Sequence, residues 1–80
     1  MTSQQTLDEV LPGCTICVVR VEGDDALSRR LTSLGFWPGT AVEVVRRAPF
    51  GDPTQFSLRG YRLALRRSEA VRVIVGQAAR

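Results

Sequence analysis

The sequence predicts a mainly β fold, in which about five short antiparallel strands curl into a small barrel and one short α-helix follows the first strand. Three observations predict this fold. The chain has 80 residues, which are too few for a two-sheet sandwich. Segments rich in β-branched residues recur along it, and turns that contain glycine or proline separate them. Because closing a short sheet into a barrel removes exposed strand edges, a barrel is the expected arrangement.

The first predicted strand covers residues 15–21, a run that is β-branched or apolar almost throughout. It follows a turn at residues 11–14, where Pro12 and Gly13 occupy positions that a β-turn favours. Gly23 interrupts the apolar pattern and ends the strand.

The predicted helix covers residues 25–34. Asp24 or Asp25 can cap its N-terminus, and Gly35 supplies the C-terminal stop. Leucines recur at positions i, i+4 and i+7 and form an apolar stripe, namely Leu27, Leu31 and Leu34. We expect this stripe to cover an open end of the barrel, which is a structural role.

The second predicted strand covers residues 41–47, where apolar and polar residues alternate, and it follows a Pro-Gly turn at residues 37–40. Residues 48–53 are predicted to form a loop, because neither Pro49 nor Pro53 fits a central strand. Asp52 is expected to bond to the backbone of its own turn.

The clearest pattern predicts a β-hairpin around Gly60 and Tyr61, taken as the two central residues of a type II′ turn. This register places Arg59 opposite Arg62. It also puts four apolar side chains on one face, toward the core, namely Phe56, Leu58, Leu63 and Leu65. A short turn at residues 68–70 and a last strand at 71–75 follow. An SH3-like barrel is the fold of this size that accommodates these elements.

The composition predicts a single domain over residues 7–75, with residues 1–6 and 76–80 as frayed ends. Hydrophobic residues make up 44% of the chain and charged residues 24%, which is ordinary for a folded domain. No apolar run approaches the roughly 20 residues of a membrane helix. The N-terminus lacks the features of a secretory signal, which favours a cytoplasmic location.

Basic residues are concentrated in the second half of the chain. Residues 46–72 hold seven arginines against two acidic residues, whereas residues 1–45 hold three arginines against six acidic residues. This asymmetry favours an acidic protein surface, a nucleic acid or anionic lipid as the partner. A solvated basic face without a partner is the alternative.

Cys14 and Cys17 have the C-x2-C spacing of zinc knuckles and redox sites. In a strand, however, positions i and i+3 point to opposite faces, and the chain has neither a second cysteine pair nor a histidine. We therefore expect no required cofactor, and an adventitious or dimer-bridging divalent metal is the alternative. Without histidine or lysine, no Cys-His or Ser-Lys pair exists, so we do not expect an enzyme.

Several short motifs, taken together, resemble one family, the small FeoA proteins that accompany bacterial ferrous-iron transporters. The matching pieces are Arg30-Leu31, Leu34-Gly35, Pro38-Gly39, Val44-Val45, Ala48-Pro49, Gly51-Asp52-Pro53 and Leu63-Ala64-Leu65-Arg66. The resemblance covers residues 7–75, and Trp37 departs from it where a smaller residue is expected. It implies a cytoplasmic SH3-like protein that is not an enzyme. It also implies docking on the cytosolic, GTPase-bearing region of the FeoB permease, in support of iron uptake at the cytoplasmic face of the membrane.

The candidate partner-binding residues are aromatic, basic or adjacent to a turn: Trp37, Pro38, Arg47, Arg59, Tyr61 and Arg62. Aromatic side chains at turns often anchor partners, and arginines that face each other suggest an acidic counterpart. Docking on the permease is the first hypothesis. The alternatives are a metal-responsive module at the two cysteines and a basic nucleic-acid-binding barrel, although nucleic acid is the less favoured partner. An exposed strand edge could also pair two copies of the chain as a homodimer.

Overall fold

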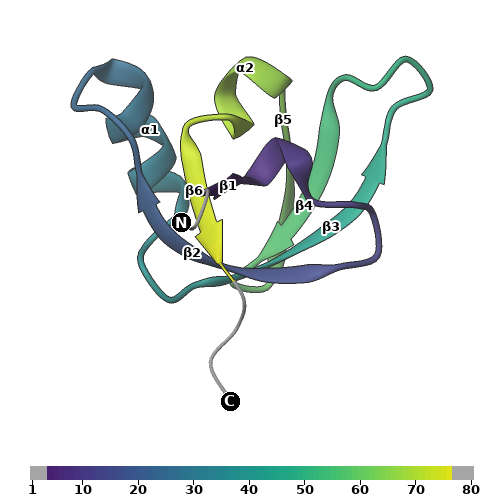
Figure 1. Ribbon diagram of the computed structural model, residues 1–80, viewed down its shortest axis with the longest axis horizontal. Helices are drawn as coiled ribbons and strands as arrows, with labels where there is room; N and C mark the ends of the chain where they lie inside the picture. The colour runs from purple at the N-terminus through teal and green to yellow at the C-terminus, as the bar shows by residue number, and fades with distance from the viewer. Residues whose placement is uncertain (1–3, 77–80) are drawn as a thin grey trace.

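The computed structural model describes residues 4–76, and its strands curl into one antiparallel sheet (Figure 1). The strands are β1 (Gln5–Thr6), β2 (Thr15–Val21), β3 (Ala41–Arg47), β4 (Thr54–Leu58), β5 (Tyr61–Leu65) and β6 (Val73–Gly76), paired in the order β1-β6-β2-β3-β4-β5. The helices are α1 (Ala26–Leu34), the short α2 (Arg67–Ala70) and a 3-10 turn, η1 (Leu7–Glu9). The predicted mainly β class, with one main helix after the first long strand, is confirmed.

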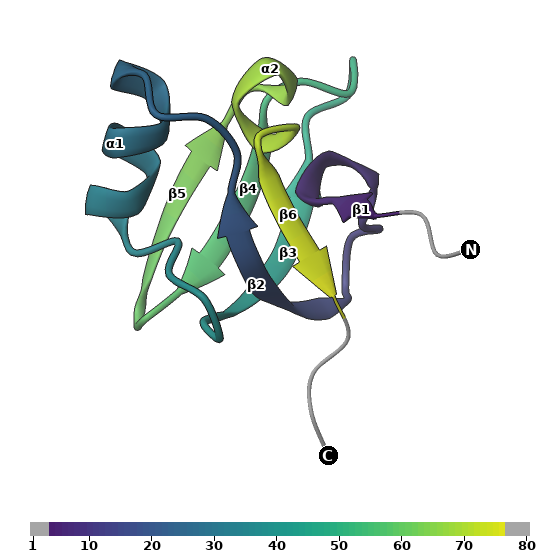
Figure 2. The ribbon, with the colours of Figure 1, turned by 60° about the vertical axis from the view of Figure 1, so that its left-hand side comes forward.

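The sheet has six strands, where about five were predicted, because the sequence pattern did not indicate the two-residue β1. The predicted closure of the barrel differs, since within residues 4–76 the end strands β1 and β5 do not pair with each other. The sheet therefore curls without closing. In Figure 2, α1 lies next to β5, one of the two end strands. Closure fails because β1 contributes only two residues before the chain turns into η1.

Alternate residues of the central strands form the core. Val42 and Val44 of β3 and Phe56 and Leu58 of β4 point inward, and each is at most 2% exposed. Burying a large apolar side chain stabilises a fold by about 1.5–3 kcal/mol. The two-residue period of β3 and β4 therefore supplies much of the stability.

The predicted helix is confirmed as α1, and both of its ends carry caps. Asp25, not Asp24, is the N-cap, because its Oδ1 accepts a hydrogen bond from the Ser28 backbone N–H at 3.3 Å. Gly35 ends the helix with a φ of 111°, a left-handed conformation that favours glycine. All three leucines of the stripe contact the core. Leu31 is fully buried, whereas Leu27 and Leu34 are partly buried.

The N-terminal segment is more ordered than expected. Gln5 and Thr6, predicted to belong to a frayed end, pair with Val75 and Ile74 of β6, and Leu7 is completely buried. A two-residue strand carries no periodic signal, so the sequence pattern could not indicate it. At the other end, Gly76 belongs to β6. Gln4 is exposed and belongs to no strand, and residues 1–3 and 77–80 of the predicted frayed ends lie outside the described residues.

The hairpin turn differs from the prediction. Its central residues are Arg59 and Gly60, with φ angles of 50° and 86°, and Leu58 lies opposite Tyr61. Two positive φ values are what a type I′ turn requires, and its twist matches that of the flanking strands. The predicted type II′ turn at Gly60 and Tyr61 is therefore wrong.

The register of β5 moves by two residues as a result. Arg62 lies opposite Ser57, and Phe56 lies opposite Leu63, so the predicted pairing of Arg59 with Arg62 does not form. A shift of two preserves the side-chain faces. The inward face is therefore as predicted, although Leu63 is only partly buried against the core.

The segment before β6 is helical. Residues 68–70, predicted as a turn, lie in α2, where the Glu69 carboxylate accepts a hydrogen bond from the Arg66 backbone N–H at 2.8 Å. Val71, predicted to begin the last strand, instead donates its N–H to the Arg67 carbonyl and is 43% exposed. None of the helices within residues 4–76 is long and apolar enough to cross a membrane.

Asp25 predicts a pH dependence of stability. A hydrogen bond from the Arg72 side chain, followed by the Ser28 backbone N–H, lowers the pKa of Asp25 from 3.8 to about 2. Because the unfolded chain binds the proton more tightly, this stabilisation is complete above about pH 4 and is lost as the pH falls toward 2. In Asp25→Asn, which keeps a capping side chain, we expect the free energy of unfolding to depend less on pH over this range.

Urea unfolding of both proteins at several pH values measures the difference. The pKa of Glu69 is also lowered, chiefly by a hydrogen bond from Arg30, but this group is common to both proteins and cancels in the comparison. Equal pH dependence in the two proteins would contradict the role of Asp25.

Candidate partner-binding site

Trp37, Arg59 and Tyr61 meet at the C-terminal end of α1, and we call them the aromatic-arginine patch. Trp37 lies in the turn before β3, Arg59 in the hairpin turn and Tyr61 at the start of β5. The Arg59 guanidinium carbon lies 4.2 Å from the centre of the Trp37 ring, a cation–π contact. Trp37 is 42% exposed and Tyr61 is 40% exposed, so part of each ring faces solvent.

Both aromatic residues bond to the end of the helix. The Trp37 Nε1–H donates to the Thr32 carbonyl at 2.7 Å, and the Tyr61 hydroxyl donates to the Leu34 carbonyl. The last carbonyls of a helix have no partner within it, so these side chains act as caps. The positive charge of Arg59 also suits the negative end of the helix dipole. These contacts hold the patch in one arrangement.

Arg59 has an unusual backbone conformation. Its φ of 50° is left-handed, and asparagine or glycine is the usual residue at the first position of such a turn. A Cβ added at Gly35 would lie 2.9 Å from the Arg59 Cδ, so the arginine packs directly on the helix stop. Glycine is therefore favoured at position 35 chiefly by its positive φ, and a larger residue there would also displace the Arg59 side chain.

The other candidate residues lie in different places. Pro38 borders a shallow hollow next to Trp37 and Arg59. Arg62 is exposed and alternates with the inward Leu63, which places it on the outer face of β5. Pro38 therefore adjoins the patch, Arg62 follows Tyr61 on the opposite face of β5, and Arg47 lies at the far end of β3.

Arg47 makes internal contacts. Its guanidinium donates to the Val10 carbonyl at 2.9 Å, to the Asp8 carbonyl at 3.4 Å and to the Thr54 hydroxyl at 3.2 Å. These bonds hold the segment after η1 against β3 and β4. The structure therefore separates Arg47 from the patch and gives it a structural role.

Asp52 also bonds differently from the prediction. Its Oδ1 accepts a hydrogen bond from the Arg67 backbone N–H at 2.8 Å, which links the β3–β4 loop to α2. The expected bond to its own turn is replaced because the chain brings the start of α2 against this loop.

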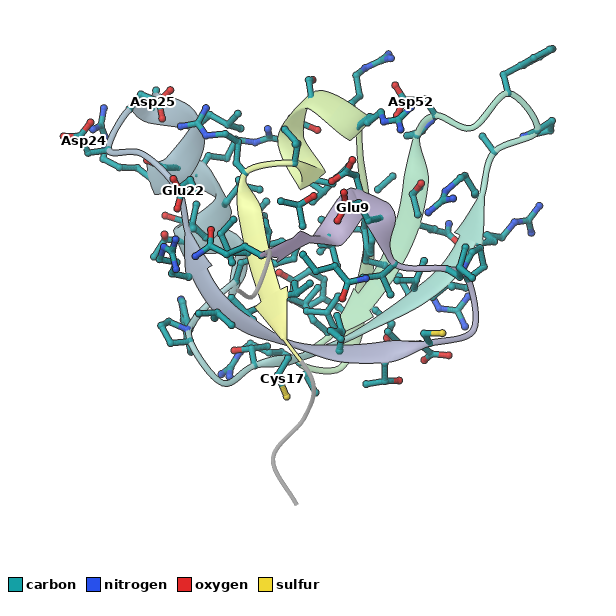
Figure 3. All side chains as sticks on the ribbon, viewed as in Figure 1. Glu9, Cys17, Glu22, Asp24, Asp25 and Asp52 are labelled. Carbon is teal, nitrogen blue, oxygen red and sulfur yellow. The ribbon has the colours of Figure 1, made fainter. Side chains whose placement is uncertain are left out.

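The two cysteines are free thiols, with Cys14 exposed and Cys17 half-buried. In Figure 3 the Cys17 sulfur points away from the core, and the labelled carboxylates Glu22, Asp24, Asp25 and Asp52 lie elsewhere. Across residues 4–76 no three His, Cys, Asp or Glu side chains are grouped so that they could hold a metal ion. The cysteines therefore offer at most two thiolate ligands in this arrangement.

Comparison with known proteins identifies the family of this chain. The family model described as the FeoA domain matches residues 5–76. The chain belongs to the FeoA family. This family is associated with ferrous iron transport; FeoA is a small accessory domain and not a known catalytic family.

A curated FeoA relative from Porphyromonas gingivalis is a fusion of Fe(2+) transport protein A with the Fe(2+) transporter FeoB. It is 35% identical over 69 residues, which are 86% of this chain. The chain spans only 8% of the length of that relative, so the activity of the whole fusion is not carried over. The fusion does support an association of FeoA with FeoB.

Solved FeoA structures share the fold. A FeoA-like protein from Clostridium acetobutylicum is 32% identical, with a TM-score of 0.88 over 100% of this chain and 93% of that one. FeoA of Stenotrophomonas maltophilia complexed with zinc is 38% identical, with a TM-score of 0.81 over 90% of this chain and 89% of that one. That protein is described as an SH3 domain protein, and the predicted SH3-like class is confirmed. A manganese-dependent transcriptional repressor, 20% identical with a TM-score of 0.82 over 95% of this chain and 37% of that one, shows the fold alone.

One exposed residue of this FeoA chain was missing from the sequence prediction. Phe50, in the loop between β3 and β4, is 98% exposed. The signal that could have revealed it is an aromatic residue between Pro49 and Pro53, in a segment already predicted to be a loop.

Proposed function

We propose that this chain docks on the cytosolic region of a FeoB-type permease and supports ferrous iron uptake. The observation that carries the proposal is the Porphyromonas gingivalis relative, in which FeoA and FeoB parts share one polypeptide. Fusion keeps two modules at a high effective concentration, which is useful when they work together. The description of the Stenotrophomonas maltophilia protein as a candidate activating factor of ferrous iron transport agrees with an accessory role. No catalysis and no bound cofactor are required.

The proposed docking surface is the aromatic-arginine patch together with Pro38 and Arg62. Aromatic residues and arginine dominate binding energy at many protein interfaces. The caps on α1 hold Trp37 and Tyr61 in place, so little side-chain entropy is lost on binding. Two exposed arginines predict an acidic surface on the permease.

A titration of the permease cytosolic region into this chain tests the proposal. Trp37 is the only tryptophan and lies in the patch, so its fluorescence reports on binding there, and calorimetry supplies an independent signal. We expect saturable binding that weakens at high salt. Arg59→Glu and Arg62→Glu should each raise Kd about tenfold, equivalent to about 1.4 kcal/mol. Arg29→Glu, on α1 away from these residues, is the control and should leave Kd unchanged.

Circular dichroism of each variant confirms that the fold is intact. If neither heat nor spectral change accompanies the titration, docking on the cytosolic region is refuted. If binding occurs and the Arg59 and Arg62 variants match the Arg29 control, the permease is the partner but the patch is not the contact. The rate of GTP hydrolysis by the permease with and without this chain then separates activation from assembly.

A further inference from the structure

The side chain of Phe50 is exposed to solvent. It is 98% exposed, the most exposed of the large hydrophobic side chains among residues 4–76. It lies in the β3–β4 loop, residues 48–53, which projects beyond the strand ends (Figure 1). Exposure alone does not mark a binding residue, but an exposed aromatic ring that is held in a fixed position can anchor a partner.

The loop that carries Phe50 is held in shape. The Gly51 N–H donates to the Ala48 carbonyl at 2.7 Å, and the Ala48 N–H donates to the Pro53 carbonyl at 3.0 Å. Pro49 and Pro53 restrict the backbone further. The bond from the Arg67 N–H to Asp52 fastens the loop to α2. The loop is therefore preorganised with its phenyl ring in water, which favours use of the ring as an anchor.

Exposed arginines and a shallow hollow surround the loop. Arg46, Arg66 and Arg67 are exposed and lie at its base, because the pairing of β3, β4 and β5 brings these strand ends together. Arg67 lies 3.6 Å from Asp8, yet its side chain is 77% exposed. Beside the loop lies a shallow hollow of about 270 Å³, lined mostly by apolar groups: Ala48, Pro49, Pro53, Ala64, Arg46 and Gln55.

We propose that Phe50 inserts into an apolar pocket with an acidic rim on the cytosolic surface of the FeoB-type permease. This inference rests on the proposed function and adds a second contact to it. Trp37 precedes β3, and the pairing of β3 with β4 puts the hairpin turn with Arg59 at the same end, whereas Phe50 follows β3. The two contacts therefore lie at opposite ends of this strand. Arg62 and Arg46 lie on the outer face between them, together with the exposed Glu43, and the proposed partner covers this face to reach both contacts.

A protein pocket fits these features better than a lipid surface. A projecting ring beside a hollow can interlock with a shaped surface, which a fluid bilayer does not offer. Stable membrane anchoring takes more than one weak signal. Here one aromatic ring is accompanied by three exposed arginines, one of which pairs with Asp8, and by a second acidic residue, Asp52. The combination of an aromatic residue and arginines is typical of protein interfaces.

The test measures binding of this chain to the full-length permease in lipid nanodiscs, with empty nanodiscs of the same lipids in parallel. Phe50→Ala is expected to raise Kd at least about tenfold, whereas Phe50→Leu should retain most of the affinity. Leu11→Ala removes another exposed apolar side chain, 65% exposed and outside the loop, and should leave Kd unchanged. All three variants should unfold at nearly the same temperature as the unmodified protein, since no buried group is removed.

The outcomes separate the two proposals. If the unmodified chain binds and Phe50→Ala binds equally well, the Phe50 contact is refuted and the proposed function stands. Binding to empty nanodiscs that depends on Phe50 would replace the protein pocket with a lipid surface and so overturn the inference. If the unmodified chain binds neither the nanodisc permease nor its cytosolic region, both proposals fail together.

Discussion

Phe56→Ala is expected to lower the free energy of unfolding by about 3–5 kcal/mol. Phe56 is completely buried in β4 and lies opposite Val44 of β3 and Leu63 of β5. Removing its ring deletes apolar contacts and leaves a cavity in the middle of the sheet. A domain of 80 residues has a total stability of about 4–12 kcal/mol, so the loss is a large fraction of it. Urea and thermal unfolding followed by circular dichroism measure the change.

The chain contains a matched control for this substitution. Phe50→Ala removes the same atoms from a residue that is 98% exposed, and its effect on stability should stay within about 0.5 kcal/mol. A similar loss in both variants would mean that burial in the sheet is not what makes Phe56 important.

The second large effect is expected for Arg47→Met, with a loss of about 2–3 kcal/mol. Methionine keeps an apolar stem but removes the donors that bind the Val10 and Asp8 carbonyls and the Thr54 hydroxyl. Hydrogen bonds from a charged group are worth more than neutral ones, and partners left without a donor add to the cost. Because these bonds fasten the N-terminal segment, amide hydrogen exchange near Leu7 should accelerate more than exchange in β4.

Arg46→Met is the control for this prediction. Arg46 is adjacent in sequence and has the same charge, but it is exposed, so the expected change is within about 0.5 kcal/mol. If the two variants are equally stable, the internal bonds of Arg47 do not stabilise the fold.

The comparison of Arg46 with Arg47 illustrates the limit of sequence reasoning for the site. Both residues contribute to the basic second half, and a count of charges cannot distinguish them. The prediction grouped Arg47 with Trp37 as a partner-binding candidate, whereas the structure places it at the far end of β3, bonded to carbonyls about 37 residues earlier in the chain. Such long-range partners follow from packing of the whole sheet and leave no local pattern.

The hairpin shows the same limit for the fold. The alternation of Phe56, Leu58, Leu63 and Leu65 correctly predicted two strands with one inward face, because a shift of two residues does not change faces. It could not determine the register, since both registers satisfy the alternation. The turn residues decided it, and an arginine with positive φ at the first turn position is uncommon enough that the pattern favoured the wrong pair.

By itself, the sequence determined the class of fold, the limits of α1 and the inward positions of β3 and β4, because caps, turn residues and two-residue alternation act over short distances. Its motifs also predicted the FeoA family, which the match over residues 5–76 confirms. Only the tertiary structure decided the open sheet, the strand formed by Gln5 and Thr6, and the meeting of Trp37, Arg59 and Tyr61 at the end of α1. It also decided that Phe50 remains in solvent while Phe56 is buried. These outcomes depend on contacts between residues far apart in the chain. Such contacts form, and contribute free energy, only after the sheet has folded.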